Sequence, residues 1–206
     1  MLMKLITCLF VFTITVGAGE LGFGQEFEKG QELYDAKKYS EAELVFREIS
    51  QKEPENAQAA YFLGLTLLEL EKFKEAESTF QRANELTPSR DQVKIGLARA
   101  YLGQQELEKA QAALDEAQRI NPDNAELHYS KGILAGARKD YKAAVVAFEK
   151  ALELKPDYAY AHYYAGLAYN ILKRPDKMLD HLQAFLKLAP NAPEAEKVKT
   201  VLRSAR

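Results

Sequence analysis

Hydrophobic and polar positions alternate along this chain with the period of an α-helix, in short runs that polar corners separate. In residues 57–90 a first run of apolar side chains has helical spacing, at Ala60, Leu63, Leu67 and Leu70. A second run follows the polar corner of Glu71 and Lys72, at Ala76, Phe80 and Ala83. Pro88 ends the second run, because proline lacks a backbone N–H and crowds the preceding turn. The stretch therefore predicts two amphipathic helices joined by a tight turn.

The same 34-residue unit recurs along most of the chain. Five of the seven prolines share one register with this spacing, at Pro54, Pro88, Pro122, Pro156 and Pro190. A column of small residues has the same period, at Gly30, Gly64, Ala98, Gly132 and Gly166, and so does a column of large apolar residues, at Phe46, Phe80, Leu114, Phe148 and Leu182. One hairpin cannot bury its own apolar stripe, so the pattern predicts units that stack on one another.

These columns resemble the tetratricopeptide repeat, a family of 34-residue helix–turn–helix units. The resemblance covers residues 23–192 and implies an all-α, right-handed superhelical solenoid of five helix hairpins. The expected units are residues 23–56, 57–90, 91–124, 125–158 and 159–192.

The last unit departs most from the pattern, because Met178 and Phe185 stand where earlier units have small residues. We therefore expect it to pack against the segment that follows. That segment, residues 193–206, is expected to form a capping helix with a narrow apolar stripe and a polar outer face. The stripe consists of Val198, Val201 and Leu202.

Residues 1–24 break the repeat pattern and have the layout of a secretory signal. Lys4 precedes a continuous run of apolar and threonine residues, Leu5 to Val16, and Gly17 and Ala18 then offer small residues for cleavage. The run is shorter than the roughly 20 apolar residues that a spanning helix needs. We therefore expect residues 1–18 to be a signal peptide, with cleavage as late as residue 24 still compatible with the layout.

The expected location is a bacterial periplasm, reached by export. Secretion from the cell is the less favoured location. Cys8 is the only cysteine of the chain and lies inside the apolar run, so the processed chain would have none and would need no disulfide. Three alternatives stay open: an uncleaved N-terminal anchor, a misassigned start of the chain, and a lipoprotein modified at Cys8.

The charge and the motifs argue against several classes of function. A net charge of −2 without long basic runs is unsuited to nucleic acid. The chain contains no nucleophile elbow, no glycine-rich phosphate loop and no zinc-protease motif. His128 and His162 occupy one register of neighbouring units, too far apart to share a metal ion, and His181 belongs to a second helix. We expect no enzymatic activity, no cofactor and no metal.

The resemblance implies a concave groove, lined by the first helix of each unit, that binds another protein. On this chain the matching positions are Phe27, Tyr34, Tyr61, Leu65, Leu68, Ile95, Arg99, Leu102, Tyr129, Ile133, Tyr160, Tyr163, Leu167 and Asn170. Most are aromatic or aliphatic, and exposed tyrosine suits interfaces because one end is apolar and the other can hydrogen-bond. The alternative interpretation is that these aromatic side chains only pack against neighbouring helices.

We therefore expect a non-catalytic exported scaffold that holds a peptide or an amphipathic helix of a partner protein. One alternative is a self-assembling structural component of an envelope complex, in which the groove or the open ends bind another copy. The other is a carbohydrate-contacting accessory protein, in which the tyrosines would stack on sugars.

Overall fold

The computed structural model describes residues 18–204, with side chains from residue 24 onward. Every regular element in that part of the chain is an α-helix, and none of these helices is long and apolar enough to cross a membrane. The signal-peptide prediction falls on residues 1–17, apart from Ala18, and those residues lie outside the described part. The helices are α1 (Ala18–Asp35), α2 (Tyr39–Lys52), α3 (Ala57–Glu69), α4 (Phe73–Leu86), α5 (Asp91–Gly103), α6 (Leu107–Ile120), α7 (Ala125–Ala137), α8 (Tyr141–Leu154), α9 (Ala159–Ile171), α10 (Pro175–Leu188) and α11 (Ala195–Ser204).

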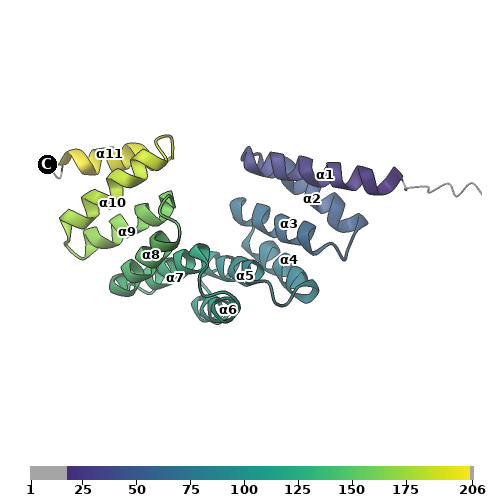
Figure 1. Cartoon of the computed structure of the whole chain (residues 1–206), viewed down its shortest axis with the longest axis horizontal. Helices are drawn as coiled ribbons and strands as arrows, with labels where there is room; N and C mark the ends of the chain where they lie inside the picture. The colour runs from purple at the N-terminus through teal and green to yellow at the C-terminus, as the bar shows by residue number, and fades with distance from the viewer. Residues whose placement is uncertain (1–17, 205–206) are drawn as a thin grey trace, which may run out of the picture.

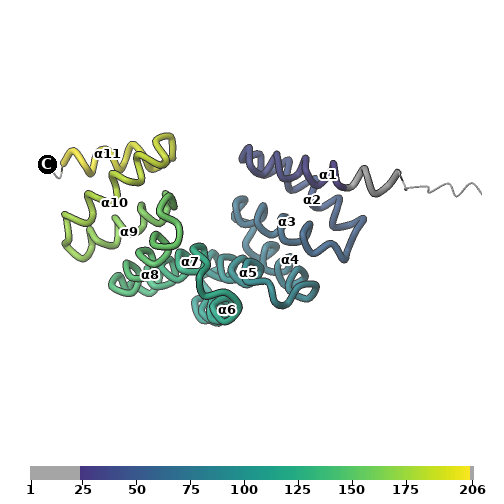
Figure 2. The backbone as a smooth tube through the Cα atoms, viewed as in Figure 1, coloured from purple at the N-terminus to yellow at the C-terminus, as the bar shows by residue number. Residues whose placement is uncertain are grey.

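Consecutive helices pack as hairpins, and each hairpin packs on the next. α1 contacts α2, α2 contacts α3, and this order continues to α11, while α3 also contacts α5 and α5 contacts α7. In Figure 1 the helices form an arc, with α5 and α7 on its inner side and α6 on its outer side. Figure 2 shows that α1 and α11 lie at the two ends of this arc and on the same side of it. The predicted all-α solenoid of stacked hairpins is confirmed.

The hairpin turns share one backbone geometry. Each contains a residue with a positive φ, at Lys37, Glu71, Gln105, Lys139 and Lys173. In the first turn the N–H of Lys37 donates to the carbonyl of Tyr34 and the N–H of Lys38 donates to Leu33, both at 2.9 Å. The same pair of bonds recurs in the other four turns and satisfies the last carbonyls of the preceding helix. This gain offsets the roughly 1–2 kcal/mol that a left-handed backbone costs a residue with a Cβ.

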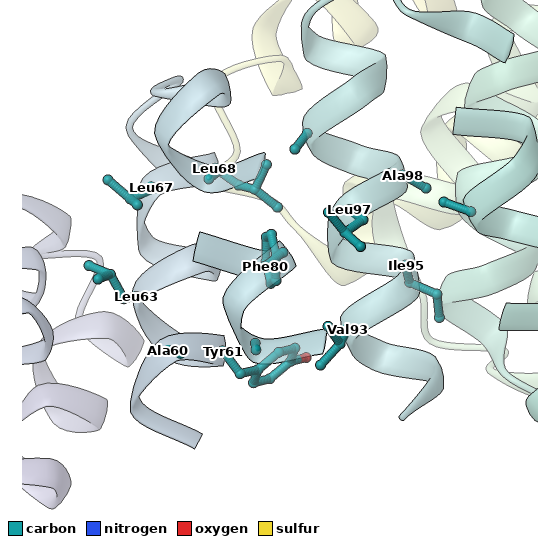
Figure 3. Close-up of a cluster of buried hydrophobic side chains, with 14 of the residues drawn as sticks. Ala60, Tyr61, Leu63, Leu67, Leu68, Phe80, Val93, Ile95, Leu97 and Ala98 are labelled. Carbon is teal, nitrogen blue, oxygen red and sulfur yellow. The ribbon is translucent and has the colours of Figure 1, made fainter. Parts of the chain in front are cut away.

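The large and the small columns of the repeat meet inside the solenoid. Phe80 is fully buried between the side chains of α3 and those of α5 (Figure 3). A Cβ built on Gly64 would lie 2.8 Å from the ring of Phe80, and a Cβ on Gly96 would be closer still. Phe148 covers Gly132 in the same way, so the small residues are small because a large ring lies against the helix at each of them.

The last hairpin packs against the C-terminal helix. Met178 and Phe185 are buried in one cluster with Val198 of α11, and the partly buried Val201 and Leu202 pack on that cluster. The apolar side of α11 therefore covers the large side chains of the last hairpin. The expectation that the last unit packs against the following segment is confirmed.

Candidate partner-binding surface

A charged cluster lies where the first helices of the middle hairpins meet. Arg99 of α5 donates to Glu126 Oε1 at the start of α7, at 3.0 Å, and to Glu69 Oε1 at the end of α3, at 3.1 Å. Burial disfavours the charge of the guanidinium, but the two carboxylates outweigh it and raise the pKa of Arg99. Because two carboxylates share one guanidinium, the cluster has a net negative charge.

Tyrosines from several hairpins lie within electrostatic range of Arg99. The positive charge of Arg99 acts on Tyr34 of α1, on Tyr61 of α3, on Tyr129 of α7 and on Tyr158, just before α9. Burial raises the pKa of each of the four, that of Tyr61 to about 12, so their hydroxyls are neutral at physiological pH. The superhelix therefore brings side chains from both ends of the repeat array towards one guanidinium.

Tyr158 is a member of this surface that the sequence analysis missed. It occupies the register of Asn56 and Asn124, whose side-chain oxygens accept hydrogen bonds from the first backbone N–H groups of α3 and α7. Tyr158 makes no such cap and instead stacks on Tyr129, with ring centroids 4.8 Å apart and an interplanar angle of 28°. A tyrosine at a capping position is the sequence signal that could have identified it.

Four of the predicted groove residues are core residues, and the prediction is corrected for them. Tyr61, Leu68, Ile95 and Tyr163 retain only 9%, 7%, 1% and 8% of their accessible surface. The ring of Tyr61 packs against Phe80. The guanidinium of Arg90, at the start of the next hairpin, lies 4.6 Å from the centre of the Tyr61 ring. The helical period separates the faces of one hairpin, but it does not show how closely the next hairpin approaches.

The other predicted residues divide into packed and accessible positions. The partly buried Phe27, Tyr34, Leu65 and Leu102 pack against the N-terminal part of the core. Tyr129 packs against Phe148 and Tyr164 as well as Tyr158. The hydroxyl of Tyr160 donates to Glu194 Oε2 at 3.2 Å, and Asn170 is exposed.

Ile133 and Leu167, also predicted for the groove, line an apolar pocket of about 340 Å³ between α7, α8 and α9. The other main walls are Gly136, Tyr141, Tyr164 and Ile171. Ile171 is 52% exposed. The pocket is a concave, open apolar surface that adjoins the predicted groove at Ile133 and Leu167.

The histidines form a contact that the sequence did not reveal. His162 Nδ1 lies 3.0 Å from His181 Nδ1, and His181 Nε2 lies 3.1 Å from Glu149 Oε1. Burial, with a smaller contribution from His181, lowers the pKa of His162. His162 Nε2 also contacts the carbonyl of Pro156 at 3.1 Å, as His128 Nε2 does that of Pro122 at 2.7 Å. Within residues 18–204 no group of three or more histidine, cysteine, aspartate or glutamate side chains is placed to hold a metal ion. We assign the histidines to packing.

Comparisons with known proteins match repeat families. Residues 27–161 match the family model described as the cytochrome c-type biogenesis protein H TPR domain, and residues 131–193 match a tetratricopeptide-repeat model. No curated protein matches the chain.

Solved structures with the same fold include TTC0263, a thermophilic TPR protein of Thermus thermophilus. It is 24% identical, with a TM-score of 0.77 over 89% of this chain and 98% of that one. PilF of Pseudomonas aeruginosa is 15% identical, with a TM-score of 0.69 over 92% of this chain and 89% of PilF. YrrB, described as a TPR protein with an unusual peptide-binding site, is 19% identical, with a TM-score of 0.56 over 89% of this chain and 98% of YrrB. At these identities the likeness shows the fold alone.

Proposed function

The chain belongs to the tetratricopeptide-repeat family described as the cytochrome c-type biogenesis protein H TPR domain, and from this membership we propose that it is an exported, non-catalytic scaffold. Its inner surface holds a peptide or helical segment of another protein. The partner is a protein and not a nucleic acid, because the chain is weakly acidic overall. The name of the family refers to the biogenesis of another protein, and a scaffold role is compatible with it.

The observation that carries this proposal is that separate hairpins join Arg99 to Glu69 and Glu126 and stack Tyr158 on Tyr129. Tyrosine and arginine are enriched where proteins bind each other, since both combine apolar contact area with hydrogen-bond donors. The adjoining apolar pocket adds a concave surface of the kind that receives a side chain.

Export is the second part of the proposal. The apolar run from Leu5 to Val16 after Lys4, followed by small residues, supports a cleaved signal and a location in a bacterial periplasm. An exported scaffold without cysteine after processing would keep its fold in an oxidising compartment.

Site-specific photo-crosslinking in the producing cells tests the scaffold role. The crosslinking residue replaces Asn170, because Asn170 is exposed and lies on the same helical face as the pocket residues Leu167 and Ile171. The matched control is Val146 of α8, which is 69% exposed on a second helix of a hairpin. We expect a defined adduct with one other protein from position 170 and none from position 146.

The purified partner is then titrated with the wild-type chain and with Arg99→Ala, after circular dichroism has shown that the variant is folded. We expect the variant to bind about tenfold more weakly, as for a central interface arginine. Equal affinities of the wild-type chain and Arg99→Ala would show that the charged cluster is not part of the binding site. Adducts only between copies of this chain would replace the scaffold role with self-assembly.

A further inference from the structure

One glycine of α7 has no packing reason for being a glycine. A Cβ on Gly132 would lie 2.7 Å from Phe148 Cζ and closer to two other ring carbons, so that position must stay small. A Cβ on Gly136, one turn later, would meet nothing within 4 Å. Gly136 does not serve the turn either, because the positive φ there belongs to Lys139. Glycine weakens a helix relative to alanine, so folding does not account for this residue.

The register of the repeat shows what Gly136 leaves open. The same position is Leu68 in the second unit and Leu102 in the third, and both side chains pack against the core. In the fourth unit the side chain is absent, and Gly136 forms part of the wall of the 340 Å³ pocket. That volume lies within the range of about 300–1,000 Å³ typical of ligand pockets. The pocket is therefore a vacant side-chain position in the repeat, with Ile171 at its rim.

The turns next to this pocket are basic. Lys139 follows Gly136 by three residues, and Lys173 follows Ile171 by two. Residues 138–142 and 172–177 contain six basic side chains and two acidic ones: Arg138, Lys139, Lys142, Lys173, Arg174 and Lys177 against Asp140 and Asp176.

In the described part of the chain, Arg138 is paired with Glu108 and Arg174 with Asp176. Lys139 and Lys173 form no ion pair there. The lysines are thus free to pair with a partner that carries the opposite charge.

We propose that the Gly136 pocket receives one large apolar side chain, a phenylalanine or a leucine, of a partner segment whose neighbouring residues are acidic. The apolar walls take the side chain, and Lys139 and Lys173 face the acidic residues beside it. The inference rests on the proposed scaffold function and names the chemistry of its partner. Charge complementarity at the turns favours this occupant over a basic or purely apolar segment.

Selection from a displayed library of random peptides against the full chain tests the proposal without a known partner. We expect the enriched peptides to share a phenylalanine or leucine flanked by aspartate or glutamate. These peptides are then synthesised and titrated with Gly136→Leu, which fills the pocket as Leu68 and Leu102 do in their units. The matched control is Ala112→Leu, because Ala112 is exposed on α6 and is not part of the pocket lining.

The expected result is a loss of at least tenfold in affinity for Gly136→Leu and less than twofold for Ala112→Leu, with both variants folded by circular dichroism. The double variant Lys139→Glu, Lys173→Glu should also weaken binding about tenfold, and added salt should weaken binding to the wild-type chain. These three effects together would establish the pocket and its acidic, apolar ligand.

Other outcomes separate the inference from the function on which it rests. Enriched peptides that bind Gly136→Leu as well as the wild-type chain but fail to bind Arg99→Ala overturn the pocket and leave the scaffold function in place. Enrichment of basic peptides overturns the stated chemistry. A dimer in light scattering that Gly136→Leu abolishes makes a second copy the occupant. A selection that enriches nothing counts against the scaffold function itself.

Discussion

Two glycines of α7, Gly132 and Gly136, should respond in opposite directions to the same substitution. In Gly136→Ala the new methyl group enters open space, because no atom lies within 4 Å of its position. Alanine also restricts the unfolded chain and favours the helix, which together are worth about 0.5–1 kcal/mol. We expect the free energy of unfolding to rise by this amount.

In Gly132→Ala the gain in helix propensity is the same, but the methyl group would lie 2.7 Å from Phe148 Cζ. Phe148 is only 2% exposed, so its ring cannot move aside without disturbing the core. Overpacking of this kind costs about 1–3 kcal/mol. The net expectation is a loss of about 1 kcal/mol and at most about 2.5 kcal/mol.

Urea unfolding of the full chain, followed by far-ultraviolet circular dichroism, measures both changes, and thermal unfolding provides a second reading. For a chain of this size each kcal/mol shifts the melting temperature by about 2–4 °C. Gly136→Ala should melt above the wild-type chain and Gly132→Ala below it. Equal stabilisation of both variants would mean that Phe148 does not pack on α7. Destabilisation of both would mean that the space beside Gly136 is already filled.

Three further predictions concern charge, capping and processing. Burial raises the pKa of Glu43, but Lys72 and Arg47 outweigh burial and hold the pKa below the usual 4.5. The ionised Glu43 therefore stabilises the fold above pH 4.5, and this contribution is lost as the pH falls through the lowered pKa. Urea midpoints should consequently depend less on acid pH in Glu43→Gln than in the wild-type chain. Asn124→Ala removes the cap of α7 and the 2.7 Å hydrogen bond to Asp91, and should cost about 1–2 kcal/mol in urea unfolding, whereas Asp123→Ala should cost little. Intact mass of protein from the periplasmic fraction should show the loss of about 18–24 residues, and a full-length mass there would favour an anchor.

The hairpins and their register could be predicted from the sequence because each unit contacts mainly its immediate neighbours. Pro88 and its equivalents mark the ends of the second helices, and Phe80 requires the small residue at Gly64, as Phe148 does at Gly132. Such contacts are local and repeat with the chain, so the period alone reveals them. The capping role of the C-terminal helix was predictable for the same reason, from a narrow apolar stripe with a polar outer face.

The surface at the centre of the arc depends on the curvature of the whole array, which no single column of residues determines. Curvature places Ile95 in the core, brings Tyr158 onto Tyr129, and joins Arg99 to glutamates of two neighbouring units. It arises from the summed side-chain volumes between successive hairpins, a sum that a periodic pattern does not contain. The register of the repeat places Gly132, but not Gly136, in the column of small residues, and only the tertiary structure shows that the space beside Gly136 opens onto a pocket.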